Sequence, residues 1–122
     1  MILEERLEGS WKSYKTLVHG KVKISCPANY QEFHFSKDGK VILEHTRDGY
    51  STAGVSNRTW GLKTVTDREG DSQTYLVLNN KLQYQIVSLN KDFLVIKTLL
   101  GTIYFAREAK WQELTAVTAS LN

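Results

Sequence analysis

The chain has 122 residues, of which 41% are hydrophobic and 24% are charged, a composition that fits one folded domain and excludes a disordered segment. Its 16 basic and 13 acidic residues give a formal net charge of +3 and are scattered along the chain. Because no helix-turn-helix pattern, zinc-finger spacing or aromatic RNA-binding motif accompanies this charge, we expect no nucleic-acid partner.

The start of the chain and its cysteine content bear on location. The segment MILEERLEGS lacks the basic and apolar regions of a signal peptide, and no apolar run approaches the length of a membrane span. The single cysteine, Cys26, cannot form an internal disulfide, which is typical of a reducing compartment. We therefore expect a cytoplasmic protein, with the periplasm as the alternative if a signal segment has been removed.

Eight β-strands are predicted in chain order, because each run is rich in β-branched or aromatic residues and alternates in polarity. They cover residues 10–18, 30–36, 40–46, 57–66, 73–79, 82–88, 93–99 and 102–108. Short turn-like segments join most of them, which favours antiparallel pairing of consecutive strands, and a sheet of this size loses its edges by closing. The sequence therefore predicts an all-β fold, an eight-stranded antiparallel up-and-down barrel over residues 9–108 of a single domain, 1–122.

The predicted turns indicate which side chains point into the barrel. A three-residue loop in SKDGK, with Gly39 in the left-handed conformation, pairs Phe33 with Leu43 and Phe35 with Val41. These four apolar residues then share one face of the hairpin, which we assign to the interior.

Two further hairpins give the same kind of apolar face. A two-residue turn in LNNK pairs Tyr75 with Tyr84 on the inward face. A two-residue turn in LLGT pairs Ile96 with Phe105 on the inward face.

The tail, residues 109–122, is predicted to form a short C-terminal helix. Its apolar residues at near-helical spacing are Trp111, Leu114, Val117 and Leu121. The LNNK register directs Leu76 and Leu78 outward, so we expect this helix to cover them on the outer wall.

The inward faces would line a cup with apolar walls and a few polar groups, including Gln31. Small-molecule sites have this composition, because burial supplies affinity and hydrogen bonds set orientation. The predicted ligand-binding residues are Phe33, Phe35, Leu43, His45, Arg58, Trp60, Tyr75, Tyr84, Ile86, Ile96 and Phe105. Side chains can also fill an eight-stranded barrel completely, so a packed interior stays open as the alternative.

Catalytic and metal-binding patterns are not found in the sequence. His19, His34 and His45 lack the spacing of metal ligands, and the predicted register directs His34 outward. Glu32 and Glu44 are expected as neighbouring surface residues. No G-x-S-x-G segment, glycine-rich phosphate loop or C-x-x-C pair occurs. We expect neither an enzyme nor a cofactor or metal site.

Gly9-Ser10-Trp11, at the start of the first of eight predicted strands, resembles the glycine-x-tryptophan signature of the lipocalins. The segments FHFSKDGKV, TWGL, YQIVSLNKDFLVIK and YFARE follow in an order that resembles the compact bacterial lipocalin-like domains, over roughly residues 7 to 108. The resemblance implies a barrel that is open at one end and holds a small hydrophobic molecule. The chain is shorter than secreted lipocalins and lacks their disulfide. Because of these two departures, the resemblance implies no specific class of ligand.

Gly9, Trp11 and Arg107 are expected to close the other end of the barrel. Trp11 begins the first strand and Arg107 ends the last, and these strands are neighbours in a closed barrel. An unpaired inward guanidinium is costly, so we expect it to stack on the Trp11 indole, as the lipocalin resemblance also implies. Gly9 would let the chain pass closely, with Leu3 and Leu7 packing beneath.

We therefore expect a non-enzymatic protein that binds or transports a small hydrophobic ligand, as a monomer or weak homodimer. The first alternative is a structural or interaction domain with a filled barrel. The second is a relative of the cytosolic fatty-acid-binding proteins. That family has two lid helices between its first two strands, for which residues 19–29 are too few, and YFARE does not reproduce its R-x-Y arrangement.

Overall fold

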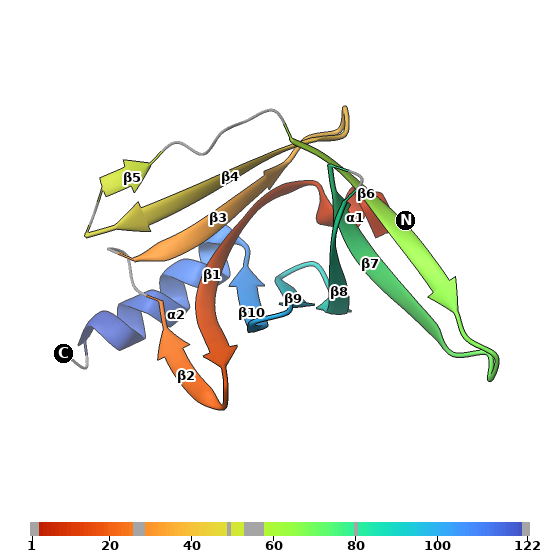
Figure 1. Cartoon of the computed structure of the whole chain (residues 1–122). Helices are drawn as coiled ribbons and strands as arrows, with labels where there is room; N and C mark the ends of the chain where they lie inside the picture. The colour runs from red at the N-terminus through yellow and green to blue at the C-terminus, as the bar shows by residue number, and fades with distance from the viewer. Residues whose placement is uncertain (1–2, 26–28, 49, 53–57, 80, 121–122) are drawn as a thin grey trace.

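The computed structural model describes residues 3–25, 29–48, 50–52, 58–79 and 81–120 (Figure 1). The elements in chain order are α1 (Leu3–Leu7), β1 (Gly9–Val18), β2 (Lys21–Ile24), β3 (Tyr30–Phe35), β4 (Lys40–Arg47), β5 (Tyr50–Thr52), β6 (Arg58–Thr66), β7 (Ser72–Leu78), β8 (Leu82–Leu89), β9 (Phe93–Lys97), β10 (Gly101–Ala106) and α2 (Glu108–Ser120).

Eight of the strands form a closed antiparallel barrel. The order around the barrel is β1, β3, β4, β6, β7, β8, β9 and β10, and β10 pairs with β1 to complete the ring. Each of these strands overlaps one of the eight predicted runs. The predicted fold class is confirmed.

Two short strands lie outside the ring and were not predicted. Strand β2 pairs with the second half of β1, beyond the point where β3 ends its pairing with β1 at Lys12. Strand β5 pairs with the last part of β4. The segment KVKI of β2 does alternate in polarity, but it is only four residues long and all four residues are exposed.

The junction between β4 and β6 is the shortest in the ring. These strands pair only through Lys40 with Thr59 and Val41 with Arg58. Beyond this point β6 continues with β7 as a long hairpin that extends away from β4 (Figure 1).

The β3–β4 hairpin has the predicted register. Gly39 has a φ of 83°, and the Ser36 amide donates a hydrogen bond to the Lys40 carbonyl at 2.9 Å. Phe33 therefore lies opposite Leu43, and Phe35 lies opposite Val41.

The predicted register of the β7–β8 hairpin is wrong by one residue. Leu78 pairs with Leu82, so the connection has three residues, and Tyr84 lies opposite Leu76 instead of Tyr75. A shift of one residue exchanges the two faces of a strand. Leu76 and Leu78 are therefore inward and only 0% and 1% exposed, and Tyr75 lies on the outer face.

The turn residue Asn79 is held by a contact from outside the β7–β8 hairpin. Asn79, which has a φ of 54°, donates its amide to the Thr59 carbonyl and accepts the Thr59 amide on its side-chain oxygen, both at 2.9 Å. These bonds hold the end of β7 against the start of β6. The register also buries Leu76 and Leu78 in place of Tyr75 and Val77, so the Tyr75 hydroxyl does not have to be taken out of water.

The β9–β10 hairpin is shifted by two residues from the prediction, which preserves the faces. Ile96 lies opposite Ile103, and Leu94 lies opposite Phe105. All four side chains point inward, as predicted for Ile96 and Phe105. Gly101, the first residue of β10, pairs with Val18 and lies against the Leu17 carbonyl, where a Cβ atom would collide.

The predicted C-terminal helix is present, but α2 covers a different wall. Trp111, 6% exposed, donates its Nε1 proton to the Ser13 carbonyl of β1 at 2.9 Å and packs on Tyr30 of β3. The expected cover over Leu76 and Leu78 is wrong, because those leucines are inside the barrel. Leu114 is 38% exposed, and the Val117 side chain and Leu121 lie outside the described residues.

Candidate functional site

One end of the barrel is closed by an arginine stacked on a tryptophan. The guanidinium carbon of Arg107 lies 3.7 Å from the centroid of the Trp11 ring, so the predicted contact is confirmed. Arg107 also donates hydrogen bonds to the carbonyls of Ser10 at 3.1 Å and Arg6 at 2.8 Å. Burial lowers the pKa of Arg107 below its ordinary value, because desolvation disfavours the charged form.

The residues around this stack fit it closely. Gly9 has a φ of 101°, and a Cβ atom there would lie 2.8 Å from a terminal nitrogen of Arg107. The Trp11 indole donates to the Leu7 carbonyl at 2.8 Å, and Leu7 is fully buried. The side chain of Leu3, the other expected partner, lies outside the described residues. This end therefore joins α1, β1 and the end of β10, which is a structural role.

Four of the predicted ligand-binding residues belong to the packed core. Phe33, Phe35, Ile96 and Phe105 are all at most 3% exposed. The Phe33 ring lies 5.3 Å from the Phe35 ring and 5.2 Å from the Phe105 ring, measured between centroids. These side chains contact one another and fill their part of the interior.

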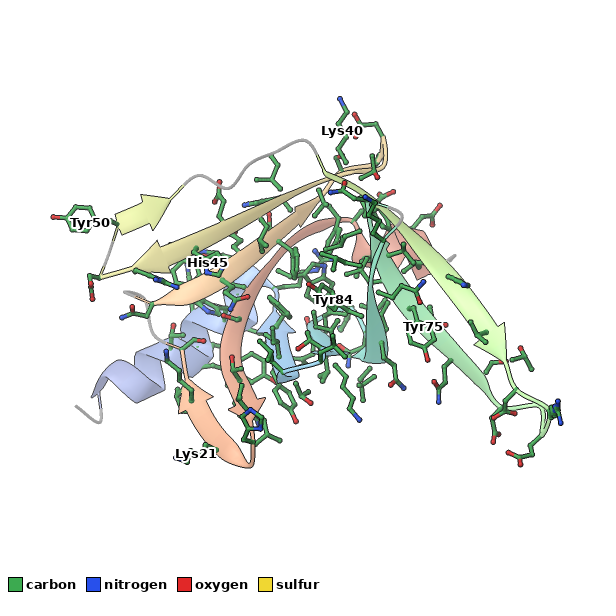
Figure 2. The ribbon with its side chains drawn as sticks, viewed as in Figure 1. Lys21, Lys40, His45, Tyr50, Tyr75 and Tyr84 are labelled. Carbon is green, nitrogen blue, oxygen red and sulfur yellow. The ribbon has the colours of Figure 1, made fainter. Side chains whose placement is uncertain are left out.

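Four other predicted residues pack against this core and keep part of their surface accessible: Leu43, Trp60, Tyr84 and Ile86. Tyr84 points toward the middle of the barrel (Figure 2). The expectation for Tyr75 is wrong, because it lies on the outer face and donates its hydroxyl proton to Gln73 at 2.7 Å. The side chain of Arg58 lies outside the described residues.

A pocket of about 450 Å³ opens between the first four strands. Its inward-facing lining includes Ser13, Thr16, Lys23, Gln31, His45 and Arg47. Of the predicted ligand-binding residues, His45 is the one on this lining; it pairs with Gln31, which was predicted to be inward. The pocket therefore lies next to the apolar interior and is more polar than the predicted cup.

The path of β1 creates this pocket. Strand β3 stops pairing with β1 at Lys12, a bulge follows at Tyr14, and β2 takes over the same edge of β1 from Lys15. The two partner strands separate here. The buried Ser13 hydroxyl bridges the gap, because it accepts the Gln31 amide at 2.9 Å and bonds to the Ser25 hydroxyl at 3.2 Å.

The electrostatic character of the pocket is positive. Lys23 and Arg47 bring cationic groups to the lining, and His45 adds an imidazole. Within the described part of the chain, the lining contains no carboxylate. A concave surface with charges of one sign raises the local concentration of ligands of opposite charge. The arrangement suits an anionic or strongly polar group.

Sequence reasoning missed most of this lining. Lys23 lies in a segment read as a loop, and Arg47 follows the predicted end of its strand. The bulge at Tyr14 changes which residues of β1 point inward, so Thr16 lies opposite inward-facing Ile103. The close spacing of Lys21 and Lys23 was the only local indication in the sequence of a basic pocket.

Comparisons with known proteins add no family assignment to this geometry. No protein-family model matches the chain, and no curated protein or solved structure shows significant similarity to it. Among the described helices, neither has the length and apolar character needed to cross a membrane.

Proposed function

We propose that the chain is a non-enzymatic, lipocalin-like protein that binds a small hydrophobic molecule with an anionic or polar head group. The observation that carries this proposal is the basic pocket between β1 and β4 beside partly accessible apolar side chains of the interior. The head group would bind Lys23 and Arg47 through charge-assisted hydrogen bonds. The apolar part would contact Ile103 and Leu43, which lie next to the pocket.

The register supports this placement of the two ligand parts. Thr16 of the pocket lies opposite Ile103, and His45 is two residues beyond Leu43 on the same face of β4. The polar lining of the pocket and the apolar interior of the barrel are therefore direct neighbours, both across paired strands and along β4. Sites with apolar walls and a few polar groups that fix orientation are typical of small-molecule carriers.

The resemblance to compact bacterial lipocalin-like domains supports the same proposal. The resemblance implies eight-strand closure and an arginine over the tryptophan of Gly9-Ser10-Trp11, and this chain has both features. Both features belong to the scaffold of the barrel and do not indicate a ligand. The support for ligand binding comes from the pocket.

A filled structural barrel is the second candidate. The mutual contacts of Phe33, Phe35 and Phe105 favour it, because these buried rings occupy the space of the predicted deep cup. The two candidates differ in whether a molecule binds at the mouth.

Binding of 8-anilinonaphthalene-1-sulfonate, which is anionic and apolar, tests the proposal by fluorescence titration. We expect a stoichiometry near one, and about fivefold weaker binding in the Lys23→Gln/Arg47→Gln variant, which corresponds to roughly 1 kcal/mol. The matched control is Lys37→Gln/Arg68→Gln, which removes the same charge from exposed turns and should bind like the wild type.

Two results would contradict the proposal. Absence of saturable probe binding would favour the filled structural barrel. Equal weakening in the pocket and control variants would show that the probe responds to net charge alone. Native mass spectrometry of freshly purified protein would add a direct search for a bound molecule.

A further inference from the structure

Three ionisable side chains meet on the outer face of the β3–β4 hairpin, away from the pocket. Glu32 of β3 lies directly opposite Glu44 of β4, and His34 is two residues along β3 on the same face. The Nε2 atom of His34 is 3.5 Å from a carboxylate oxygen of Glu32 and 3.5 Å from one of Glu44. One candidate ligand atom from each residue lies within 4.8 Å of the other two.

These separations match metal coordination better than direct hydrogen bonding. Hydrogen bonds between nitrogen and oxygen usually measure about 2.7–3.2 Å. Nitrogen and oxygen ligands lie about 2.0–2.2 Å from Zn²⁺ at tetrahedral angles, which places neighbouring ligand atoms roughly 3.3–3.6 Å apart. Both 3.5 Å distances fall in that interval.

A fourth residue orients the imidazole. Ser10 of β1 lies opposite His34, and its hydroxyl oxygen is 2.6 Å from His34 Nδ1. This bond occupies one ring nitrogen and directs the other, Nε2, between the two carboxylates. Outer-shell partners of this kind set the ring orientation of histidine ligands in metal sites. Ser10 lies outside the set of three ligands, so its position is an independent feature of the site.

The charges in this region also favour a bound cation. Like charges directly opposite on paired strands destabilise a sheet, and Glu32 and Glu44 are such a pair. The Glu32 side chain is only 13% exposed, so water screens this repulsion less than it would on an open surface. Lys12 of β1 lies opposite Glu32 but forms an ion pair with Glu108 at 2.6 Å, so Glu32 shares that charge with a second carboxylate.

We propose that Glu32, His34 and Glu44 bind a divalent transition-metal ion of the Zn²⁺ class. The imidazole and two carboxylates supply three ligands, and the fourth tetrahedral position is left for water. Ser10 is a positioning residue. The proposal is independent of the pocket, because the site faces the opposite side of the hairpin.

A second group of carboxylates in the described chain shows the contrast. Asp67, Glu69 and Asp71 also lie close together, but all three are exposed and none is accompanied by an imidazole. Asp67 accepts hydrogen bonds from the backbone amides of Glu69 and Asp71 at 2.9 Å, which accounts for its position by turn formation. These residues serve as an internal control.

Titration of the metal-free protein with Zn²⁺ by calorimetry, and with Co²⁺ by visible absorption, tests the proposal. All proteins would carry Cys26→Ser, which removes the only thiol that could compete for these ions. We expect one ion per chain and the visible spectrum of tetrahedral Co²⁺. Binding should weaken at least about tenfold in Glu44→Gln and His34→Ala, and about tenfold in Ser10→Ala.

The matched controls are His19→Ala, which removes an exposed histidine, and Asp71→Asn, which alters the other carboxylate group. Both should bind like the parent protein. Absence of stoichiometric binding would overturn the proposal, and so would loss of binding in the controls with retention in Glu44→Gln. If His34→Ala does not fold, judged by circular dichroism, the near-isosteric Glu44→Gln still decides the outcome.

Discussion

Arg107, which directly follows β10, stacks on Trp11 of β1, with 3.7 Å between the guanidinium carbon and the ring centroid. The contact therefore connects the first and last strands of the barrel. Because the cation also satisfies two backbone carbonyls, Arg107→Ala should lower the free energy of unfolding by about 1–2 kcal/mol. Urea unfolding measures this loss, and Arg68→Ala in an exposed turn is the control. Affinity for the probe should stay unchanged, and a parallel loss of affinity would place Arg107 in the binding site instead.

Gly9→Ala should destabilise the protein through two effects. The φ of 101° is unfavourable for any side chain, and the new Cβ atom would displace Arg107. Gly70→Ala is a control for the first effect alone, because Gly70 has a φ of 88° and nothing within 4 Å of the added atom. The stability loss at Gly9 should exceed that at Gly70. Equal losses of stability would show that the contact of the new Cβ atom with Arg107 does not contribute to the destabilisation.

The observed β7–β8 register makes a direct prediction about two neighbouring residues. Leu76 is fully buried, so Leu76→Ala should cost about 2–5 kcal/mol of stability. Tyr75→Ala, on the outer face, should cost much less. Thermal or urea unfolding of the two variants distinguishes the registers, because the opposite order of effects would favour an inward-facing Tyr75.

Docking of α2 should depend on pH through one ion pair. The pKa of Glu108 is below its ordinary value, chiefly because of its hydrogen bond with Lys12 Nζ at 2.6 Å. This bond therefore stabilises the folded state above the ordinary pKa of a glutamate, and the stabilisation is lost as the pH falls through the lowered value. Glu108→Gln should flatten the dependence of the melting temperature on pH in this acidic range.

The control for that experiment is Glu113→Gln on the same helix. Glu113 is more exposed, and its distance to Lys110 is 3.7 Å, so its removal should leave the pH dependence nearly unchanged. An identical response of the two variants would show that acid destabilisation arises elsewhere.

Local pattern was sufficient for much of this architecture. Alternating polarity identifies all eight barrel strands, because half-buried strands have a period of two residues. In SKDGK, Gly39 specifies one turn geometry, and the register of β3 and β4 follows from it. The contact of Arg107 with Trp11 could be predicted because closure of the ring makes the first and last strands neighbours.

Features that depend on distant segments could not be predicted in this way. LNNK permits turns of two or three residues, and the observed turn of three residues goes with burial of Leu76 and Leu78 against the rest of the barrel interior. The pocket arises where β3 and β2 separate along β1, which local polarity does not report. The structure places Arg47 and Lys23 on the lining of one pocket, and their positions in the sequence do not indicate this proximity.

The short pairing of β4 with β6 leaves a long stretch of β6 open to strand addition. From Gly61 to Thr66, the side of β6 facing away from β7 has no strand partner among the described residues. Such an edge is a template on which a second chain can extend the sheet, and a lysine within it discourages this association. Lys63 occupies the middle of the exposed edge. A positive charge at this position opposes the joining of separate chains into a continuous intermolecular sheet.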